Sequence, residues 1–454
     1  MRNLLSGVFA AVWLVTVLTP RPHAAGQTEQ DLVARARAIH DRVITLDTHN
    51  DIDPSHFTPA CNYTMRLTTQ VNLPKMKEGG LDVSFMVVYV GQSNPPQTAD
   101  AFQPSGYERA YREAVQKFDA VHALTGKIAP AEIELALTPA DVVRISRSGK
   151  KVAVIGIENG YPIGTDIGRV KEFWDRGGRY MSLAHNGHSQ LADSNTGEAN
   201  NQWMWGGLSP LGKQVIEAMN KWGIMVDVSH PSRGAVMQAM ALSKAPVIAS
   251  HSAVRTLANV SRNMDDEMLM ALKTNGGVIQ IVGFASYVKA SPPERAPAIT
   301  ALQREFGVAS RGTQTTAAQA TAARPCPVEQ PGQPIAAAPV SPAALIAARR
   351  AEYDGRMTEI DSRWPAAPRA TVKDFVDHID YAVKLIGIDH VGISSDFDGG
   401  GGIVGWNSAA ETFNVTLELV RRGYTEEQIG KIWSGNLLRV WGDVEQVAKQ
   451  IQSR

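Results

Sequence analysis

The feature that most constrains the fold is a short apolar, β-branched run that recurs along the chain and is followed by helical periodicity. Strands that are apolar along their whole length are typical of a parallel sheet buried on both faces. We expect such strands over residues 43–48, 83–90, 152–157, 180–184, 224–229, 246–250, 277–282 and 391–395. Helices are expected over residues 107–124, 166–176, 210–222, 233–242, 265–273, 371–386, 425–433 and 437–452. Eight strands with interleaved helices favour an α/β fold of the (β/α)8 TIM barrel type, with an open doubly wound sheet as the alternative.

The connection before the last strand is much longer than the others. Between residues 311 and 350 there are 12 alanines and 6 prolines among 40 residues, and no aromatic residue. Such a composition buries little apolar surface. We therefore expect a partly mobile insertion over about residues 290–368, within a single barrel domain that occupies residues 26–454.

The first 25 residues have the pattern of a secretory signal peptide. Arg2 precedes an uncharged apolar run over residues 4–18, and Ala24 and Ala25 offer small residues for cleavage. The run is short for a membrane span, and an uncleaved anchor is the alternative. We expect an exported protein, periplasmic or secreted, with no stable membrane anchor after signal cleavage. In such an oxidising compartment Cys61 and Cys326 can form a disulfide or remain free thiols.

The charge balance argues against one large class of partner. Lys and Arg together number 45, and Asp and Glu also number 45. A protein that binds nucleic acid through phosphate contacts needs a basic surplus. We therefore expect no nucleic-acid partner.

Side chains that bind metals follow the expected strands. His49 and Asp51 follow the first strand, two positions apart and so on one side of an extended chain. Glu158 follows the third strand, and His230 and His251 follow the fifth and sixth. The carboxyl ends of barrel strands meet at one face, so these five side chains are expected to lie together.

Three imidazoles and two carboxylates exceed what one catalytic zinc ion needs. A shared carboxylate lets such a set hold two metal ions about 3.5–4 Å apart around a bridging hydroxide. Glu158 is the expected bridge, because its strand lies between the other two ligand pairs in sequence order.

Three further residues are assigned roles around this centre. Asp396, after the eighth strand, would take a proton from the attacking water and pass it to the leaving amine. His185, after the fourth strand, would bind or polarise the carbonyl oxygen. Arg262 could bind a substrate carboxylate with its forked guanidinium group.

The motifs around these residues resemble those of the membrane dipeptidase (renal dipeptidase) family of zinc peptidases. They are HND (49–51), IGIENG (155–160), SLAHN (182–186), LSPLG (208–212), VDVSH (226–230), PVIASHS (246–252), SRN (261–263), SSDFDG (394–399) and GNLLRV (435–440). The resemblance implies a barrel of the metal-dependent amidohydrolase type with two zinc ions per chain. It implies hydrolysis of small dipeptides, including those with a D- or dehydro residue at the C-terminal position, by a homodimer.

Carried over by position, the resemblance implies one zinc site of His49, Asp51 and Glu158 and a second of Glu158, His230 and His251. It also implies that His185 and Arg262 contact substrate and that Asp396 assists proton transfer. The polar C-terminus, residues 447–454, lacks the lipid-anchor signal of animal relatives.

Two alternative functions are considered. Another binuclear amidohydrolase, acting on cyclic amides or lactones, would often bridge its metals with a carboxylated lysine at a strand end. No lysine follows the third or fourth strand here. A non-catalytic peptide-binding protein on the same scaffold would predict a broken ligand set, whereas all five ligands are present.

Overall fold

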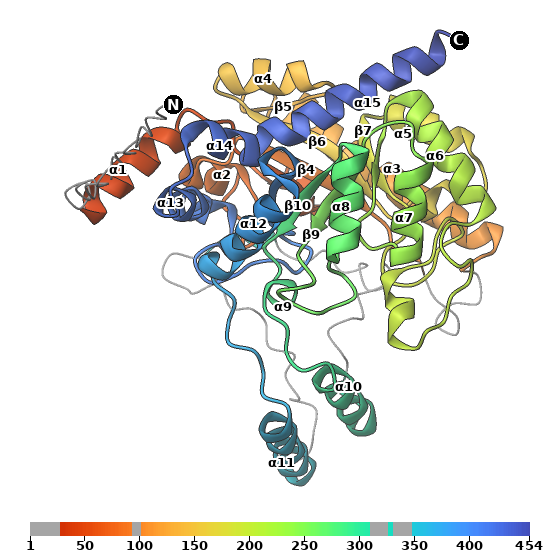
Figure 1. The fold of residues 1–454 in the computed structure, drawn as a ribbon, viewed down its shortest axis with the longest axis vertical. Helices are drawn as coiled ribbons and strands as arrows, with labels where there is room; N and C mark the ends of the chain where they lie inside the picture. The colour runs from red at the N-terminus through yellow and green to blue at the C-terminus, as the bar shows by residue number, and fades with distance from the viewer. Residues whose placement is uncertain (1–27, 93–100, 309–325, 330–346) are drawn as a thin grey trace, which may run out of the picture.

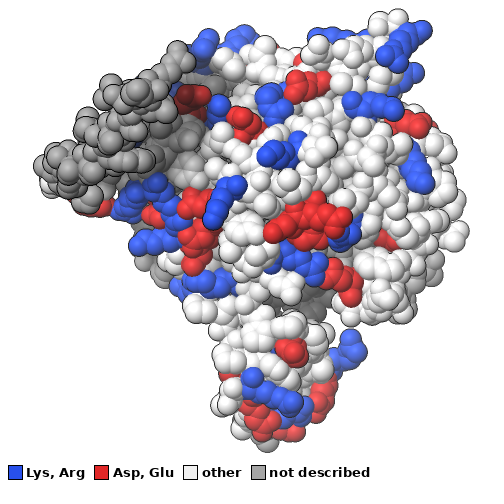
Figure 2. Space-filling model, viewed as in Figure 1, with Lys and Arg blue, Asp and Glu red and all other residues white. Residues whose placement is uncertain are grey.

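A computed structural model of the chain describes residues 28–92, 101–308, 326–329 and 347–454. The predicted signal peptide and most of the Ala/Pro-rich stretch lie outside the described residues. Within the described residues, none of the helices combines the length and the apolar character needed to span a bilayer. Figure 2 shows that basic and acidic side chains are interspersed on the face in view.

Eight parallel strands form a TIM barrel at the centre of the molecule (Figure 1). An isolated parallel bridge between Asn50 and Phe397 connects the first strand to the last, and the Asp51 amide donates to the Phe397 carbonyl at 2.9 Å. This closure confirms the predicted fold class. In spatial order the strands are β1 (Leu46–Asp51), β4 (Val83–Tyr89), β6 (Lys151–Glu158), β7 (Gly178–Ser182), β8 (Met225–Asp227), β9 (Ile248–Ser252), β10 (Val278–Val282) and β11 (Val391–Ser394).

Helices form an outer layer around these strands (Figure 1), and the expected helices are all present, two with the predicted bounds and the others with shifted ends. They are α3 (Pro104–Ala123), α5 (Gly168–Asp175), α6 (Pro210–Trp222), α7 (Arg233–Leu242), α8 (Asp266–Asn275), α12 (Val372–Ile386), α14 (Glu426–Gly430) and α15 (Asn436–Gln452). The prediction omitted α1 (Glu29–His40), α2 (Leu73–Gly79), α4 (Pro139–Arg147), α9 (Ala285–Val288), α13 (Phe413–Arg421), β5 (Ile133–Leu135) and the hairpin of β2 (Phe57–Thr58) and β3 (Cys61–Asn62).

The predicted bounds of the first strand, residues 43–48, are wrong. The strand runs over Leu46–Asp51, so His49 and Asp51 lie within it rather than after it. His251 likewise lies inside β9, and Glu158 is the last residue of β6. An apolar pattern ends where polar side chains begin, but the ladder with the neighbouring strand continues through Asp51, which pairs with Val87.

The insertion contains two helices that the prediction also omitted. Helices α10 (Arg295–Phe306) and α11 (Ala347–Arg363) project from the barrel and pack on each other (Figure 1). Their contact buries a small core of Leu302, Phe306, Tyr353 and Ile360. Spacing at i and i+4 places Leu302 and Phe306 on one helical face, which explains how an Ala-rich region still forms a packed pair.

A short piece of the insertion, residues 326–329, returns to the barrel. Cys326 forms a disulfide with Cys61, with 5.4 Å between their Cα atoms. Val328 makes an antiparallel bridge with Leu67, and the Thr68 amide donates to the Pro327 carbonyl at 2.7 Å. Of the two states considered for the cysteines, the structure therefore shows the disulfide.

Candidate metal centre

The carboxylate of Glu158 lies at the centre of a buried cluster of histidines at the carboxyl end of the barrel. Its Oε1 is 2.9 Å from Nε2 of His230 and 3.3 Å from Nε2 of His251. Its Oε2 is 3.5 Å from Nε2 of His49. One carboxylate therefore faces ring nitrogens from three strand ends, with Oε2 nearest His49 and Oε1 nearest His230 and His251.

The other predicted site residues surround this carboxylate. Nε2 of His185 is 3.7 Å from Oε1 of Glu158. Asp51, Asp396 and His49 form a group in which one donor atom from each residue lies within 4.8 Å of the others. The structure thus brings all five predicted ligands together, and it adds His185, beside Glu158 and His230, and Asp396, beside His49 and Asp51, to the same cluster.

A tyrosine within β7 orients His49. Tyr180 Oη donates to the Thr48 carbonyl at 3.0 Å and lies 2.9 Å from Nδ1 of His49. Since the hydroxyl proton goes to Thr48, the oxygen accepts the Nδ1–H of His49, which leaves the lone pair on Nε2. That Nε2 is buried and has no hydrogen-bond partner among the described residues, as expected of a metal ligand.

A serine and an aspartate orient His251 in the same way. Ser250 Oγ donates to Asp227 Oδ2 at 2.6 Å and lies 2.8 Å from Nδ1 of His251. The proton of the imidazole is therefore on Nδ1, and Nε2 faces Glu158. Sequence reasoning missed Tyr180, Ser250 and Asp227, although an aspartate inside an otherwise apolar strand is itself a signal.

Two site residues occupy left-handed backbone conformations. The φ angle is 76° at His230 and 60° at Asp396. Residues other than glycine rarely adopt this region, and such strain concentrates at functional sites. The turn after Asp396 is secured by Asp398, whose Oδ1 accepts from the Gln70 amide at 2.8 Å.

Burial and the carboxylates together set the protonation of the site. Burial, together with the negative charges of Asp51 and Glu158, raises the pKa of Asp396 to about 8. Burial lowers the pKa of His49, but the Glu158 carboxylate outweighs it and raises that pKa to about 9. The acidic groups therefore favour a positive charge at this place, and a metal cation can replace the proton on His49. The donor set of imidazoles and carboxylates fits zinc, and it also suits other divalent transition metals.

Arg262 lies beside the cluster on the β9 side. Its guanidinium donates to Ser252 Oγ at 3.0 Å and to the His251 carbonyl at 2.8 Å. Its Nε is buried without a partner among the described residues, and its Cζ lies 5.5 Å from the ring centroid of Tyr287. The predicted substrate-binding arginine is thus at the edge of the site, with unused donor capacity.

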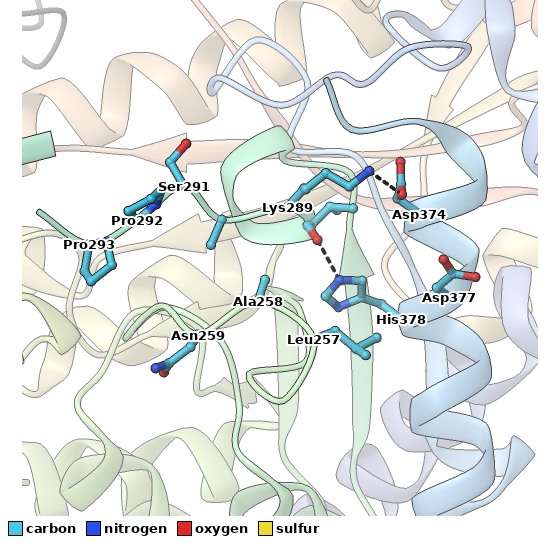
Figure 3. A pocket seen from close by; sticks show the side chains of 12 residues that line it. Leu257, Ala258, Asn259, Lys289, Ser291, Pro292, Pro293, Asp374, Asp377 and His378 are labelled. Atoms are coloured by element: carbon cyan, nitrogen blue, oxygen red, sulfur yellow. Dashed lines mark hydrogen bonds and ion pairs between the residues drawn. The ribbon is translucent and has the colours of Figure 1, made fainter. Parts of the chain in front are cut away.

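A separate pocket of about 550 Å³ lies between the loop after β9, helix α9 and helix α12 (Figure 3). It contains none of the candidate ligands. His378 borders it and accepts from the Val254 amide at 3.0 Å, while its Nε2 donates to the Val288 carbonyl at 3.0 Å. The residues around this pocket therefore support the loop that carries Arg262.

The barrel and its histidine–carboxylate centre define a metal-dependent hydrolase. A family model described as membrane dipeptidase (Peptidase family M19) matches residues 33–454. The chain belongs to this family of metallo-dipeptidases, which are hydrolases acting on peptide bonds.

Individual relatives agree with this assignment. The chain is 28% identical over 422 residues to dipeptidase aclJ of Aspergillus oryzae, covering 90% of this chain and 80% of that protein. It is 32% identical to the crystal structure of the probable dipeptidase PvdM from Pseudomonas aeruginosa, with a TM-score of 0.73, covering 92% of this chain and 100% of that chain. A metallo peptidase from Rhodobacter sphaeroides, liganded with a phosphinate mimic of L-Ala-D-Ala, shares the fold at 20% identity and a TM-score of 0.63, covering 88% of this chain and 99% of that chain.

Proposed function

We propose that the protein is an exported dipeptidase that uses two zinc ions bridged by Glu158. The observation that carries this proposal is the division of the Glu158 carboxylate, with Oε2 toward His49 and Oε1 toward His230 and His251. One ion would be held by His49, Asp51 and Glu158 and the other by Glu158, His230 and His251. Bound divalent metals supply Lewis-acid chemistry, polarising a carbonyl group and lowering the pKa of water.

Three side chains around the metal ions transfer protons and bind the substrate. Asp396 is the general base and acid: its position beside His49 and Asp51 suits it to accept a proton from the attacking water and to pass it to the leaving amine. His185 donates a hydrogen bond to the carbonyl oxygen as negative charge develops there. Arg262 binds the C-terminal carboxylate of the dipeptide with its free donor capacity.

The substrates we propose are dipeptides, including those with a D- or dehydro residue at the C-terminal position. Support comes from the Rhodobacter metallo peptidase, which is liganded with a mimic of L-Ala-D-Ala. A homodimer without a nucleic-acid partner is part of the same proposal, from family resemblance and from the balanced charge.

Export to the periplasm or the medium is supported by the disulfide. Cys61 and Cys326 are paired, and such bonds persist in oxidising compartments. The apolar pattern of residues 1–25 would provide the signal peptide.

The test combines elemental analysis with hydrolysis of Ala-Ala and Gly-D-Ala, with and without a chelator. We expect about two zinc ions per chain and activity that the chelator removes. Glu158→Gln should lose most bound metal and most activity, whereas Glu427→Gln, an exposed control, should keep both. Wild-type turnover in Glu158→Gln would contradict the bridging role. Hydrolysis of lactones but not dipeptides would favour a different amidohydrolase.

A further inference from the structure

Lys117 places a positive charge at the edge of the metal centre that the proposed chemistry does not use. It is a partly buried residue of helix α3, and its Nζ lies 5.7 Å from the ring centroid of Tyr89. Tyr89 ends strand β4 and contacts His185, with 3.2 Å between Tyr89 Oη and His185 Nδ1. One aromatic ring therefore separates the ammonium group from a residue assigned to the substrate.

Carboxylates of the metal centre act on the charge of Lys117. Burial lowers the pKa of Lys117, and the opposing carboxylates are, in order of strength, Asp51, Asp53, Glu158 and Glu113. The position of Lys117 Nζ over the Tyr89 ring, whose hydroxyl contacts His185, places the ammonium group beside the metal centre. Among the described residues no carboxylate is within ion-pair distance of it.

The barrel places Lys117 opposite Arg262. Lys117 lies over β4, whereas Arg262 follows β9, and these strands are four positions apart in a ring of eight. With the C-terminal carboxylate of a dipeptide on Arg262, as proposed above, its first residue would lie on the β4 side of the barrel, where Lys117 is. Divalent ions held by Asp51 and Glu158 would offset the negative charge that now faces the ammonium group.

We propose that Lys117 is a specificity-determining residue that binds an acidic side chain on the first residue of the dipeptide. The substrate class would be dipeptides beginning with Asp or Glu, and this inference rests on the proposed dipeptidase function. A carboxylate reaching Lys117 would meet a desolvated ammonium group beside an aromatic ring, where a charge pair is stronger than at the surface.

The test compares Glu-Ala with Gln-Ala, which differ in charge but hardly in shape, as substrates of the zinc-loaded enzyme. We expect wild type to have the higher kcat/KM on Glu-Ala, and Lys117→Gln to reduce the Glu-Ala to Gln-Ala ratio by about ten-fold, mainly through KM. Arg112→Gln removes an exposed cation from the same helix and should leave the ratio unchanged. Elemental analysis and hydrolysis of Ala-Ala establish that each variant is intact.

The outcomes separate the two proposals. An unchanged ratio in Lys117→Gln, or an equal loss on both substrates, would overturn the specificity role and leave the dipeptidase intact. Failure of the zinc-loaded wild type to cleave Ala-Ala, Gln-Ala and Glu-Ala would overturn the dipeptidase function and the inference together.

Discussion

Replacement of Tyr180 by phenylalanine tests whether the orientation of His49 controls metal binding. The change removes one oxygen atom from a fully buried ring. That oxygen accepts from Nδ1 of His49 at 2.9 Å and donates to the Thr48 carbonyl at 3.0 Å. Gly156 packs against the same hydroxyl, where any larger side chain would clash, so the backbone of β6 is shaped around this contact.

The expected loss of zinc affinity follows from the unpaired Nδ1–H that the substitution leaves on His49. Without the hydroxyl, the Nδ1–H of His49 is buried without an acceptor, which costs about 1–3 kcal/mol. Loss of a group that orients a metal ligand typically lowers metal affinity about 10–100-fold, equivalent to about 1.4–2.8 kcal/mol. We therefore expect Tyr180→Phe to bind zinc 10–100-fold more weakly than wild type.

The assay is titration with zinc in the presence of a competing chelator, together with thermal unfolding of the metal-free protein. Tyr161→Phe is the matched control, because Tyr161 is also fully buried and its hydroxyl donates to the Ala101 carbonyl, away from the ligand cluster. The control should lose stability but keep its zinc affinity. Equal zinc affinity in folded Tyr180→Phe and wild type would refute the assigned role of the tyrosine.

Two further predictions concern the site turn and its support. A methyl group on Gly399 would clash with Asp51 Oδ2 and Asp396 Oδ1, so Gly399→Ala should lose at least about ten-fold in kcat/KM, whereas Gly442→Ala, where nothing lies within 4 Å, should retain activity. Undiminished activity of Gly399→Ala would show that the turn can move without cost. Burial lowers the pKa of His378, so folding favours its neutral form, and the stability it contributes is present above about pH 6.5 and lost as the pH falls toward its folded pKa. Urea unfolding between pH 7 and pH 5 should therefore show a steeper loss for wild type than for His378→Gln, and parallel curves would contradict this.

Much of the architecture could be predicted because its signals are local. Apolar runs are long in the buried strands, and α6 and α7 begin after serine caps, so their bounds match the prediction. The elements that were missed are short or have few apolar residues: half of α1 is polar, and it begins with a capping box at Thr28. Helices α10 and α11 are stabilised mainly by each other, and the separation of 40 residues between them hides that contact from any local pattern.

The sequence by itself determined the residue types available to the site, because metal ligands at successive strand ends of a parallel barrel must converge on one face. Only the tertiary structure decided how they are used. It turned Oε2 of Glu158 toward His49 and Oε1 toward His230, and it placed Tyr180 against His49 and Lys117 over the ring of Tyr89. The physical reason is that protonation, tautomer and charge depend on distances of a few ångströms between residues far apart in the chain, and only the packing of the folded protein sets those distances.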